Sequence, residues 1–267
     1  MSPDPATAHL WRDWPYPRIV SHRGGGKLAP ENTLAAFEMG ASLGLQMVEF
    51  DAKLSADNVV FLLHDDTVDR TSNGHGSAAQ MTYAEIEELD AGSWFGADGR
   101  FAGQTMPTLA QVAERCQALG LAANVEIKPC PGREAETGTL VAQAVKALWA
   151  GQAQPPLLSS FSYEALEAAA AAVPELPRGM LYEAVPAHWR DDARKLGTVT
   201  LHASHKHLDG PQVAEIKAAG LHMLVYTVNE PARARELAAW GVDAICTDRI
   251  DLIGADFLAD LRSSKGR

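Results

Sequence analysis

Eight short apolar runs alternate with stretches of helical periodicity along almost the whole chain. We predict strands near residues 19–22, 47–51, 123–128, 157–160, 178–182, 198–202, 223–227 and 244–247. We predict helices near residues 33–43, 109–119, 134–148, 163–172, 188–196, 211–219, 231–239 and 252–261. Alternating strands and helices favour parallel pairing, so eight such pairs predict an α/β fold, a closed (β/α)8 or TIM barrel. The 267 residues suffice for one such domain, which we place at residues 14–258.

One segment interrupts the alternation, between the second predicted strand and the helix at 109–119. Residues 67–107 are rich in Gly, Ser and Asp, and they carry Trp94 and Phe95 in a setting that looks exposed. Loops that follow barrel strands build the active-site face, so we predict an inserted subdomain that caps the substrate site. A surface insertion without such a role is the alternative.

The charge of the chain excludes one broad class of partners. Lys and Arg number 23 against 34 Asp and Glu, which gives a formal net charge of -11. Proteins that bind nucleic acid in general need a basic surface to displace counterions from phosphates. We therefore expect no nucleic-acid partner, and any phosphate that the protein handles is held locally.

The N-terminal residues and the cysteines indicate the cellular compartment in which we expect the protein. The start, Met-Ser-Pro-Asp-Pro-Ala, has an acid where a signal peptide has a basic region, and no apolar run approaches the ~18 residues of a membrane helix. The three cysteines, Cys116, Cys130 and Cys246, are widely spaced and form no Cys-x-x-Cys pair, which indicates neither a disulfide framework nor a zinc site. We predict a cytoplasmic protein without membrane insertion, whose oligomeric state stays open.

The first predicted strand ends in polar residues. Residues 21–26 read Ser-His-Arg-Gly-Gly-Gly. The side chains of His22 and Arg23 can both act on phosphate, and three glycines leave a backbone with little side-chain bulk. We predict an anion site here, although His-Arg-Gly at a strand end is also typical of an ordinary turn.

Carboxylates lie in the second and third predicted strands. Alternate residues of a strand share a face, so Glu49 and Asp51 point the same way, and the same spacing pairs Glu126 with Lys128. Two carboxylates on one face of an apolar strand are costly unless water, arginine or a metal compensates them. Together Glu49, Asp51 and Glu126 would form an oxygen-rich pocket suited to one hard divalent cation, Mg²⁺ or Ca²⁺. The alternative is an exposed edge strand with solvated acids.

Histidines supply further candidates. His64 follows an apolar run, so His22 and His64 can serve as acid and base near neutral pH. His202, at the end of the sixth predicted strand, is a candidate substrate contact. With His205 and His207 it forms a cluster that indicates either a second metal or, in our preferred interpretation, solvated loop residues.

Several residues mark the ends of predicted helices. Asn32 is interpreted as an N-cap, and Pro231 as a first-turn residue. Asp248 is interpreted as a cap of the last helix. Glycines just past three helix ends fit C-terminal caps, at Gly120, Gly220 and Gly241.

In combination these motifs resemble a known family. They are His22-Arg23-Gly24, Glu31-Asn32-Thr33, Glu49-x-Asp51, His64-Asp65, Glu126-x-Lys128 and Tyr226-Thr227-Val228-Asn229. The chain resembles the glycerophosphodiester phosphodiesterases over about residues 14–248, in particular the cytoplasmic bacterial type associated with glycerol-3-phosphate uptake. The resemblance implies a (β/α)8 barrel with an insertion after its second strand. It also implies hydrolysis of glycerophosphodiesters, such as glycerophosphocholine and glycerophosphoethanolamine, to sn-glycerol 3-phosphate and an alcohol.

The same resemblance implies roles for the candidate residues. The implied catalytic acid and base are His22 and His64. The implied ligands of one divalent cation are Glu49, Asp51 and Glu126. The implied phosphate contacts are Arg23 and Lys128. Tyr226 stands where many members of the family have Trp. The side chain at this position is still aromatic, but its contacts to glycerol can differ.

Two other functions stay open. A phospholipase-like barrel would cleave phospholipids through a related pair of histidines, but the sequence shows no amphipathic basic segment for a membrane surface. A barrel that only binds a phosphorylated ligand would tolerate loss of one histidine, yet both are present with all three carboxylates. No Ser-His-Asp or Cys-His set suggests a covalent protein nucleophile.

Overall fold

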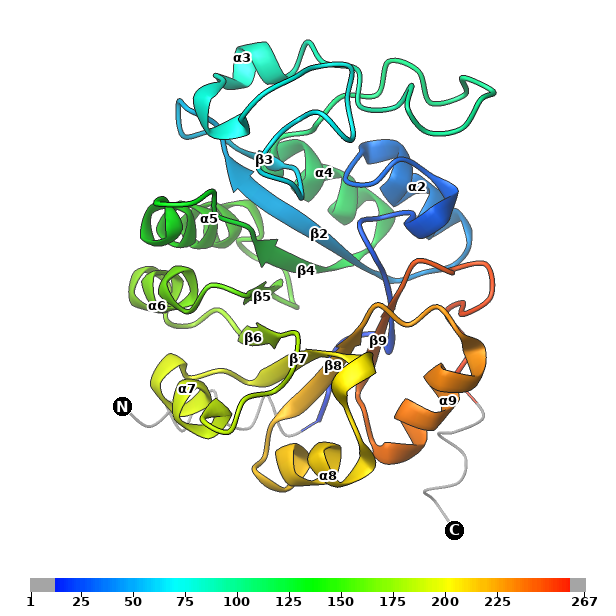
Figure 1. Cartoon of the computed structure of the whole chain (residues 1–267), viewed down its shortest axis with the longest axis vertical. Helices are drawn as coiled ribbons and strands as arrows, with labels where there is room; N and C mark the ends of the chain where they lie inside the picture. The colour runs from blue at the N-terminus through cyan, green and yellow to red at the C-terminus, as the bar shows by residue number, and fades with distance from the viewer. Residues whose placement is uncertain (1–12, 260–267) are drawn as a thin grey trace.

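Eight parallel strands close into a barrel in the computed structural model of the chain, which describes residues 13–259. They are β1 (Ile19–Ser21), β2 (Met47–Leu54), β4 (Ala122–Ile127), β5 (Leu157–Ser160), β6 (Arg178–Tyr182), β7 (Thr200–Ser204), β8 (His222–Tyr226) and β9 (Ala244–Thr247). Strand β1 pairs in parallel with both β9 and β2 and so closes the ring. The predicted TIM barrel is confirmed, and each predicted strand is present (Figure 1).

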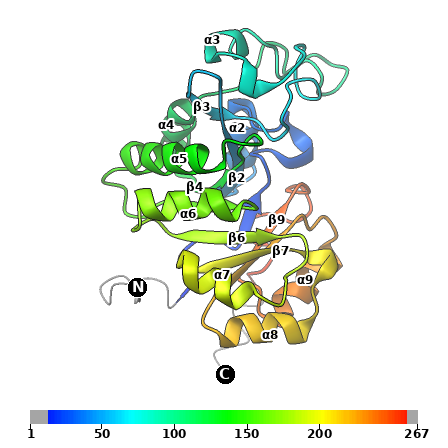
Figure 2. The same ribbon diagram turned by 60° about the vertical axis from the view of Figure 1, so that its left-hand side comes forward.

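Helices surround the strands in chain order (Figures 1 and 2). They are α2 (Leu34–Ser42), α4 (Leu109–Leu119), α5 (Glu134–Leu148), α6 (Tyr163–Ala172), α7 (Trp189–Leu196), α8 (Gly210–Ala218) and α9 (Pro231–Trp240). Their apolar faces pack with the outward faces of the strands in one continuous cluster. No helix within residues 13–259 has both the length and the apolar character needed to cross a bilayer.

Local chemistry fixes the helix ends. Gly120 and Gly241 adopt the left-handed conformation directly after α4 and α9, as predicted. Pro231 opens α9, where its missing N–H costs no helical hydrogen bond. The prediction of Asn32 as an N-cap is wrong. The cap of α2 is Thr33, which accepts a hydrogen bond from the third residue of the helix, while Asn32 turns toward the barrel.

The barrel interior changes from apolar to polar along the strand direction. Met47, Glu49 and Asp51 share the inward face of β2, whereas Val48 and Phe50 pack against the helices. The apolar part of the interior contains Tyr16, Val20, Met47, Leu157, Leu224, Ala244 and Cys246. Buried polar residues follow toward the carboxyl ends of the strands, including Glu49, Asp51, Asn124, Glu126, Ser159 and His202. Polar groups therefore gather at the end of the barrel where active sites of this fold lie.

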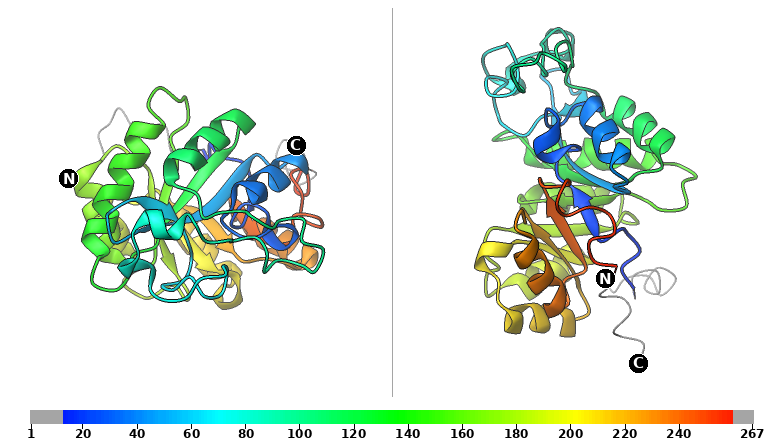
Figure 3. Two further views of the ribbon diagram at one scale, coloured as in Figure 1. Left: turned by 90° about the horizontal axis from the view of Figure 1, so that it is seen from above. Right: turned by 90° about the vertical axis from the view of Figure 1, so that its right-hand side faces the viewer.

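The apolar run at residues 59–63 forms an additional strand outside the ring. Strand β3 (Val60–Leu62) pairs antiparallel with the end of β2. The segment from β3 to α4 contains the 3-10 turn η2 (Ala78–Gln80) and the short helix α3 (Tyr83–Ile86). It has an apolar cluster of its own, formed by Phe61, Leu63, Val68, Ala78, Ile86, Ala91 and Met106. This segment projects from one end of the long axis of the molecule (Figures 1 and 3).

A loop at residues 92–103 extends this segment further. Both ends of the loop are tied to Asp90, whose carboxylate accepts hydrogen bonds from the backbone N–H groups of residues 92, 93 and 103. Phe95 and Phe101 pack with Ala36 and neighbouring residues of α2, whereas Trp94 is exposed. The loop is thus closed at its neck and anchored at its tip to the helix that follows β1.

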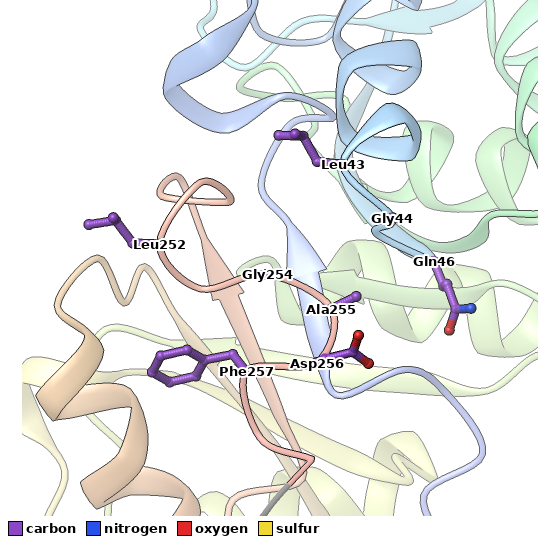
Figure 4. A pocket seen from close by; sticks show the side chains of 8 residues that line it. All are labelled: Leu43, Gly44, Gln46, Leu252, Gly254, Ala255, Asp256 and Phe257. Carbon is purple, nitrogen blue, oxygen red and sulfur yellow. The ribbon is translucent and has the colours of Figure 1, made fainter.

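The helix predicted at residues 252–261 does not form over the described part, residues 252–259. That part consists of turns, with backbone hydrogen bonds such as Phe257 N–H to Gly254 C=O. Glycine disfavours a helix interior, and Gly254 lies at the third position of the predicted helix. The segment passes beside the turn between α2 and β2 and leaves a hollow of about 500 Å³ there (Figure 4). None of the predicted site residues lines this hollow.

Candidate active site

Three buried carboxylates lie together at the carboxyl ends of β2 and β4. Register places Asp51 opposite Glu126, and Glu49 lies two residues earlier on the same face. One oxygen from each of Glu49, Asp51 and Glu126 lies within 4.8 Å of the other two. Strand β2 is flanked by β1 and β4, so the alternative of an exposed edge strand is excluded.

The donor set of this cluster fits a hard divalent cation. All three donors are carboxylate oxygens, the ligand type that Mg²⁺ and Ca²⁺ prefer. The Oε1 atom of Glu49 is buried and has no hydrogen-bond partner in the protein. An orphaned buried carboxylate oxygen is costly, and coordination of a cation would satisfy it.

The protonation behaviour of the cluster follows from burial and crowding. Burial and the charge of Asp51 raise the pKa of Glu49 to about 8, and the same two causes raise the pKa of Glu126. Burial also acts to raise the pKa of Asp51, but Arg23 and other nearby cations outweigh it and lower that pKa. Asp51 is therefore the carboxylate of the cluster that ionises most readily, and additional positive charge would stabilise the ionised forms of Glu49 and Glu126.

Two cationic side chains flank the carboxylates, and both are residues that the family resemblance implies as phosphate contacts. The Nε atom of Arg23 lies 3.3 Å from Asp51, and the Nζ atom of Lys128 lies 2.9 Å from Glu126. Arg23 has φ of 50°, a left-handed backbone that is uncommon for a non-glycine residue. This backbone directs its N–H to the Oε2 atom of Glu49 at 3.1 Å. Strain of this kind concentrates at functional sites.

Asn32 also contacts the cluster, a role that its interpretation as a helix cap did not include. Its side-chain amide donates a hydrogen bond to Oδ2 of Asp51 at 2.9 Å, and its Oδ1 atom accepts one from the Asp51 N–H at 3.2 Å. Like Arg23, Asn32 has a left-handed backbone, with φ of 59°. The double hydrogen bond fixes the orientation of the Asp51 carboxylate.

His22 is oriented by a residue from the opposite end of the chain. Its Nδ1 atom donates to Oδ1 of Asp248 at 2.6 Å, and the other Asp248 oxygen accepts from Asn229 at 3.0 Å. The Nε2 atom of His22 lies 3.8 Å from Glu49. Burial acts to lower the pKa of His22, but the hydrogen bond to Asp248 and the charge of Glu49 outweigh it and raise that pKa. The interpretation of Asp248 as a helix cap is wrong, because Asp248 positions His22.

One glycine of the run after His22 makes this contact possible. A Cβ atom on Gly26 would lie 2.2 Å from the backbone oxygen of Asp248, and the next N–H donates to that same oxygen at 2.9 Å. Only glycine permits so close an approach between two backbones. At Gly26 the reduced bulk thus serves the approach of the end of β9.

His64 is held in a similar way by its neighbour in sequence. Its Nδ1 atom donates to Oδ1 of Asp65 at 2.7 Å. Burial, together with the positive charges of Arg23 and Lys128, lowers the pKa of His64 in spite of the opposing charge of Asp51. Both histidines therefore have Nδ1 bound to a carboxylate, which leaves Nε2 as the atom able to exchange a proton.

Tyr226 and His202 differ in depth. Tyr226 pairs in register with Ser204, and its hydroxyl donates to the backbone of Tyr182 at 2.8 Å. Its ring meets that of Phe161 edge to face, with 5.9 Å between centroids. His202 lies two residues before Ser204, deeper in the barrel, and neither of its ring nitrogens has a hydrogen-bond partner in the protein. Burial lowers the pKa of His202 to about 3, so the ring is neutral.

The remaining histidine cluster does not gather as a metal site. His207 lies 3.4 Å from Glu183, and His205 belongs to the 3-10 turn η3 (His205–His207). Within residues 13–259 the one group of at least three metal-ligating side chains is the carboxylate cluster. The preferred interpretation of solvated loop residues fits His207, whose side chain is 49% exposed, whereas His205 is only partly exposed and its Nδ1 atom is buried.

Comparison with known proteins agrees with this arrangement. The model of the glycerophosphoryl diester phosphodiesterase family matches residues 22–252. A glycerophosphodiester phosphodiesterase of Caldanaerobacter subterraneus subsp. tengcongensis is 32% identical over 234 residues, or 86% of this chain and 93% of that protein. One of Bacillus subtilis is 32% identical over 251 residues, or 87% of this chain and 84% of that protein.

Solved structures show the same relationship in three dimensions. A phosphodiesterase of Oleispira antarctica in complex with the product sn-glycerol-3-phosphate is 35% identical, with a TM-score of 0.86 over 96% of this chain and 99% of that one. A glycerophosphodiester phosphodiesterase of Agrobacterium tumefaciens is 33% identical, with a TM-score of 0.75 over 90% of this chain and 99% of that one. The chain belongs to the glycerophosphoryl diester phosphodiesterase family and is a hydrolase of glycerophosphodiesters.

Proposed function

We propose that the protein hydrolyses glycerophosphodiesters such as glycerophosphocholine and glycerophosphoethanolamine to sn-glycerol 3-phosphate and an alcohol, with the help of one divalent cation. The observation that carries the proposal is the joint placement of His22 and His64 with the carboxylate cluster. Each histidine has Nδ1 bound to a carboxylate, and the charge of a cluster residue, Glu49 or Asp51, acts on its pKa. The product complex of the Oleispira antarctica phosphodiesterase supports the same substrate class.

The carboxylate cluster is the proposed cation site, with Mg²⁺ or Ca²⁺ as the candidate ions. When bound, a divalent cation supplies charge that stabilises the non-bridging oxygens of the phosphate. Arg23 and Lys128 are proposed to contact those oxygens as well, because both lie beside the cluster. Their present partners are carboxylates, so binding of the phosphate would exchange one set of oxygen acceptors for another.

The two histidines are proposed to divide the proton transfers between them. We assign His22 as the base that deprotonates the nucleophile through Nε2, with Asp248 stabilising the resulting imidazolium. We assign His64 as the acid that protonates the leaving alcohol. The raised pKa of His22 depends in part on the charge of Glu49, which a bound cation would share. The pKa directions in the absence of a cation favour the reverse roles, so a leaving-group experiment decides between the two assignments.

The nucleophile has two candidates. Water would give sn-glycerol 3-phosphate in one step. The neighbouring glycerol hydroxyl would instead form a cyclic glycerol phosphate that water then opens. The second route would require a glycerol hydroxyl beside the scissile ester.

The aromatic wall and the insertion are proposed to contact the rest of the substrate. Tyr226 would line the glycerol side, since it shares an edge-to-face contact with Phe161 near Lys128. His202, predicted as a substrate contact, lies deeper than this wall, and we retain it only as part of the barrel lining. The segment at about residues 67–107 is proposed to cap the site and to select the alcohol.

The proposed setting is the cytoplasm. Cys116, Cys130 and Cys246 are all buried as free thiols, which suits a reducing compartment. The acidic net charge gives no reason to expect a nucleic-acid partner.

An assay of sn-glycerol 3-phosphate release tests the proposal directly. Purified protein is incubated with glycerophosphocholine in the presence of Mg²⁺, Ca²⁺ or an excess of chelator, and with a phospholipid in parallel. We expect release that requires a cation and is absent with the phospholipid. Release that persists in chelator would refute the proposed need for a cation. Cleavage of the phospholipid would favour the phospholipase alternative. Tight binding of glycerophosphocholine without release would favour a binding protein.

A further inference from the structure

Arg70 lies in the inserted segment, and its guanidinium joins two carboxylates. Its Nε and Nη2 atoms donate to the two oxygens of Asp65 at 2.6 and 3.0 Å. Its Nη1 and Nη2 atoms donate to the two oxygens of Glu31 at 2.8 Å each. One planar group thus forms two bidentate pairs at once, which fixes the relative orientation of both carboxylates.

Each of these carboxylates holds a different residue of the proposed site. Asp65 accepts the hydrogen bond from Nδ1 of His64 at 2.7 Å. Glu31 accepts a hydrogen bond from Nη1 of Arg23 at 2.7 Å. A continuous set of hydrogen bonds therefore runs from His64 through Asp65, Arg70 and Glu31 to Arg23.

The shape of the guanidinium matters more here than its charge. The side chain of Arg70 is 45% exposed, so water screens its charge. Its planar guanidinium, however, can donate two parallel hydrogen bonds to each of two carboxylates, which the compact ammonium group of lysine cannot do. Without the guanidinium, Asp65 and Glu31 could each rotate, and the Nδ1–H tautomer of His64 would lose its fixed acceptor.

We propose that Arg70 is a positioning residue that aligns His64 and Arg23 together through Asp65 and Glu31. Its hydrogen bonds go to Asp65 and Glu31 and not to the carboxylate cluster, so it acts through the two acids it joins. The catalytic part of this inference rests on the proposed function, in which His64 transfers a proton and Arg23 contacts phosphate. Through Arg70 the insertion contributes to the geometry of the reaction, in addition to any selection of the alcohol.

The test compares Arg70→Ala and Arg70→Lys with a control, Arg115→Ala. Arg115 pairs with Glu38 at 2.8 Å between the outer helices α4 and α2, so its loss removes a surface ion pair of similar length. We expect Arg70→Ala to lower kcat for glycerophosphocholine by on the order of 10²-fold, since small misplacement of a reacting group has effects of this size. Arg70→Lys should recover little, and the control should match the wild type. If Arg70→Lys had the kcat of the wild type, the inference that the planar guanidinium is needed would be overturned.

A double-mutant cycle with Asp65→Asn shows whether Arg70 acts through Asp65. If it does, the double variant should lose much less kcat/KM than the product of the two single losses, because both changes release the same histidine. Losses that multiply would overturn the inference. The comparison holds whichever histidine proves to be the acid.

Imidazole ¹⁵N spectra give a readout that needs no activity. At a pH where the rings are neutral, we expect His64 of the wild type in the Nδ1–H tautomer, and a mixture of tautomers in Arg70→Ala and not in Arg115→Ala. An unchanged His64 spectrum would overturn the inference. A wild type that shows this tautomer but releases no sn-glycerol 3-phosphate would refute the proposed function while leaving the positioning role standing.

Discussion

At the scale of residues, two histidines with similar partners differ in their electrostatic surroundings. His22 is enclosed with Asp248 and Glu49, which raise its pKa against the effect of burial. His64 is partly exposed, and burial with two nearby cations lowers its pKa. Such opposite shifts suit two groups to divide acid and base roles, and taken alone they favour His22 as the acid and His64 as the base, the reverse of our assignment.

A substrate with a nitrophenol leaving group should distinguish the two histidines. Nitrophenolate departs as a stable anion near neutral pH and needs little protonation. Glycerol-phosphoryl-nitrophenol should therefore restore much of the activity of His64→Ala and leave His22→Ala inactive, as measured by initial rates of nitrophenolate release. Restoration of His22→Ala instead would exchange the roles. Restoration of neither would mean that both residues chiefly position the phosphate.

The buried ring of His202 should make the protein sensitive to acid. The pKa is about 3 in the folded chain and about 6.5 in the unfolded one, so between these values the unfolded chain takes up a proton that the folded chain does not. Stability is therefore lost as pH falls below about 6.5, by about 1.4 kcal/mol per pH unit. A variant without the ring should lack this contribution to the pH dependence of stability.

Between pH 7 and pH 5, we expect the free energy of unfolding of His202→Leu to fall by about 2 kcal/mol less than that of the wild type, as measured by urea unfolding. Leucine leaves no protein atom unpaired, because neither ring nitrogen has a partner in the protein. His75→Leu serves as the control, since the side chain of His75 is 86% exposed. Equal pH dependence of wild type and His202→Leu would contradict the prediction.

Sequence reasoning found the charged residues of the site but not all of the residues that orient them. The carboxylate cluster was predictable because strand periodicity puts Glu49 and Asp51 on one face, and His64 has its partner at the next position. Asp248 was missed because 226 residues separate it from His22, and only closure of the barrel brings them together. Asn32 carries a residue type that is common both at helix starts and in left-handed backbone, so its type alone does not distinguish the two roles.

At the scale of elements, β2 organises the site. Its eight residues are all buried, and it pairs with β1 and β4 on its two sides before its end continues into the hairpin with β3. The alternation of strands and helices made this ring predictable from the sequence. The final helix was mispredicted because its apolar spacing is helical while Gly254 favours the turns that form.

The loop at residues 92–103 offers a sharper test of the cap than removal of the whole insertion. Replacing residues 94–102 with a short Gly-Ser link keeps Arg70 and keeps Asp90, which ties both ends of the loop. We expect a folded enzyme whose relative kcat/KM for glycerophosphocholine, glycerophosphoethanolamine and glycerophosphoglycerol changes, because loops over a barrel mouth tune substrates more than they hold the core.

Circular dichroism and thermal unfolding establish that the loop variant is folded. Replacement of exposed residues in a surface turn elsewhere, such as residues 151–153, provides a matched control. An unaltered substrate profile in a folded loop variant would refute the cap.

At the scale of the whole molecule, the buried carboxylates should couple cation binding to stability. A cation at about 100 times its dissociation constant raises the free energy of unfolding by about 2.7 kcal/mol, which corresponds to a Tm rise of about 5–10 °C for a domain of this size. The rise should be smaller at pH 6 than at pH 8.5, because below its raised pKa Glu49 binds a proton that the cation must displace.

Differential scanning fluorimetry with Mg²⁺, Ca²⁺ and chelator measures this coupling. Glu49→Gln, Asp51→Asn and Glu126→Gln should each lose most of the Tm rise and most of the cation affinity in calorimetric titration. Glu175→Gln, at a surface pair with Lys146, should retain both. Unchanged binding in all three cluster variants would contradict the assignment of the ligands.

The contact between His22 and Asp248 also has a consequence for synthesis of the protein on the ribosome. His22 leaves the exit tunnel early, whereas its carboxylate partner directly follows β9, the strand that completes the ring, and is translated 226 residues later. A nascent chain arrested before residue 248 therefore carries both histidines and all three cluster acids and still lacks the group that orients His22. An oriented His22 should therefore appear only after residue 248 has left the exit tunnel, so chains arrested before that point should not act on the phosphodiester pool.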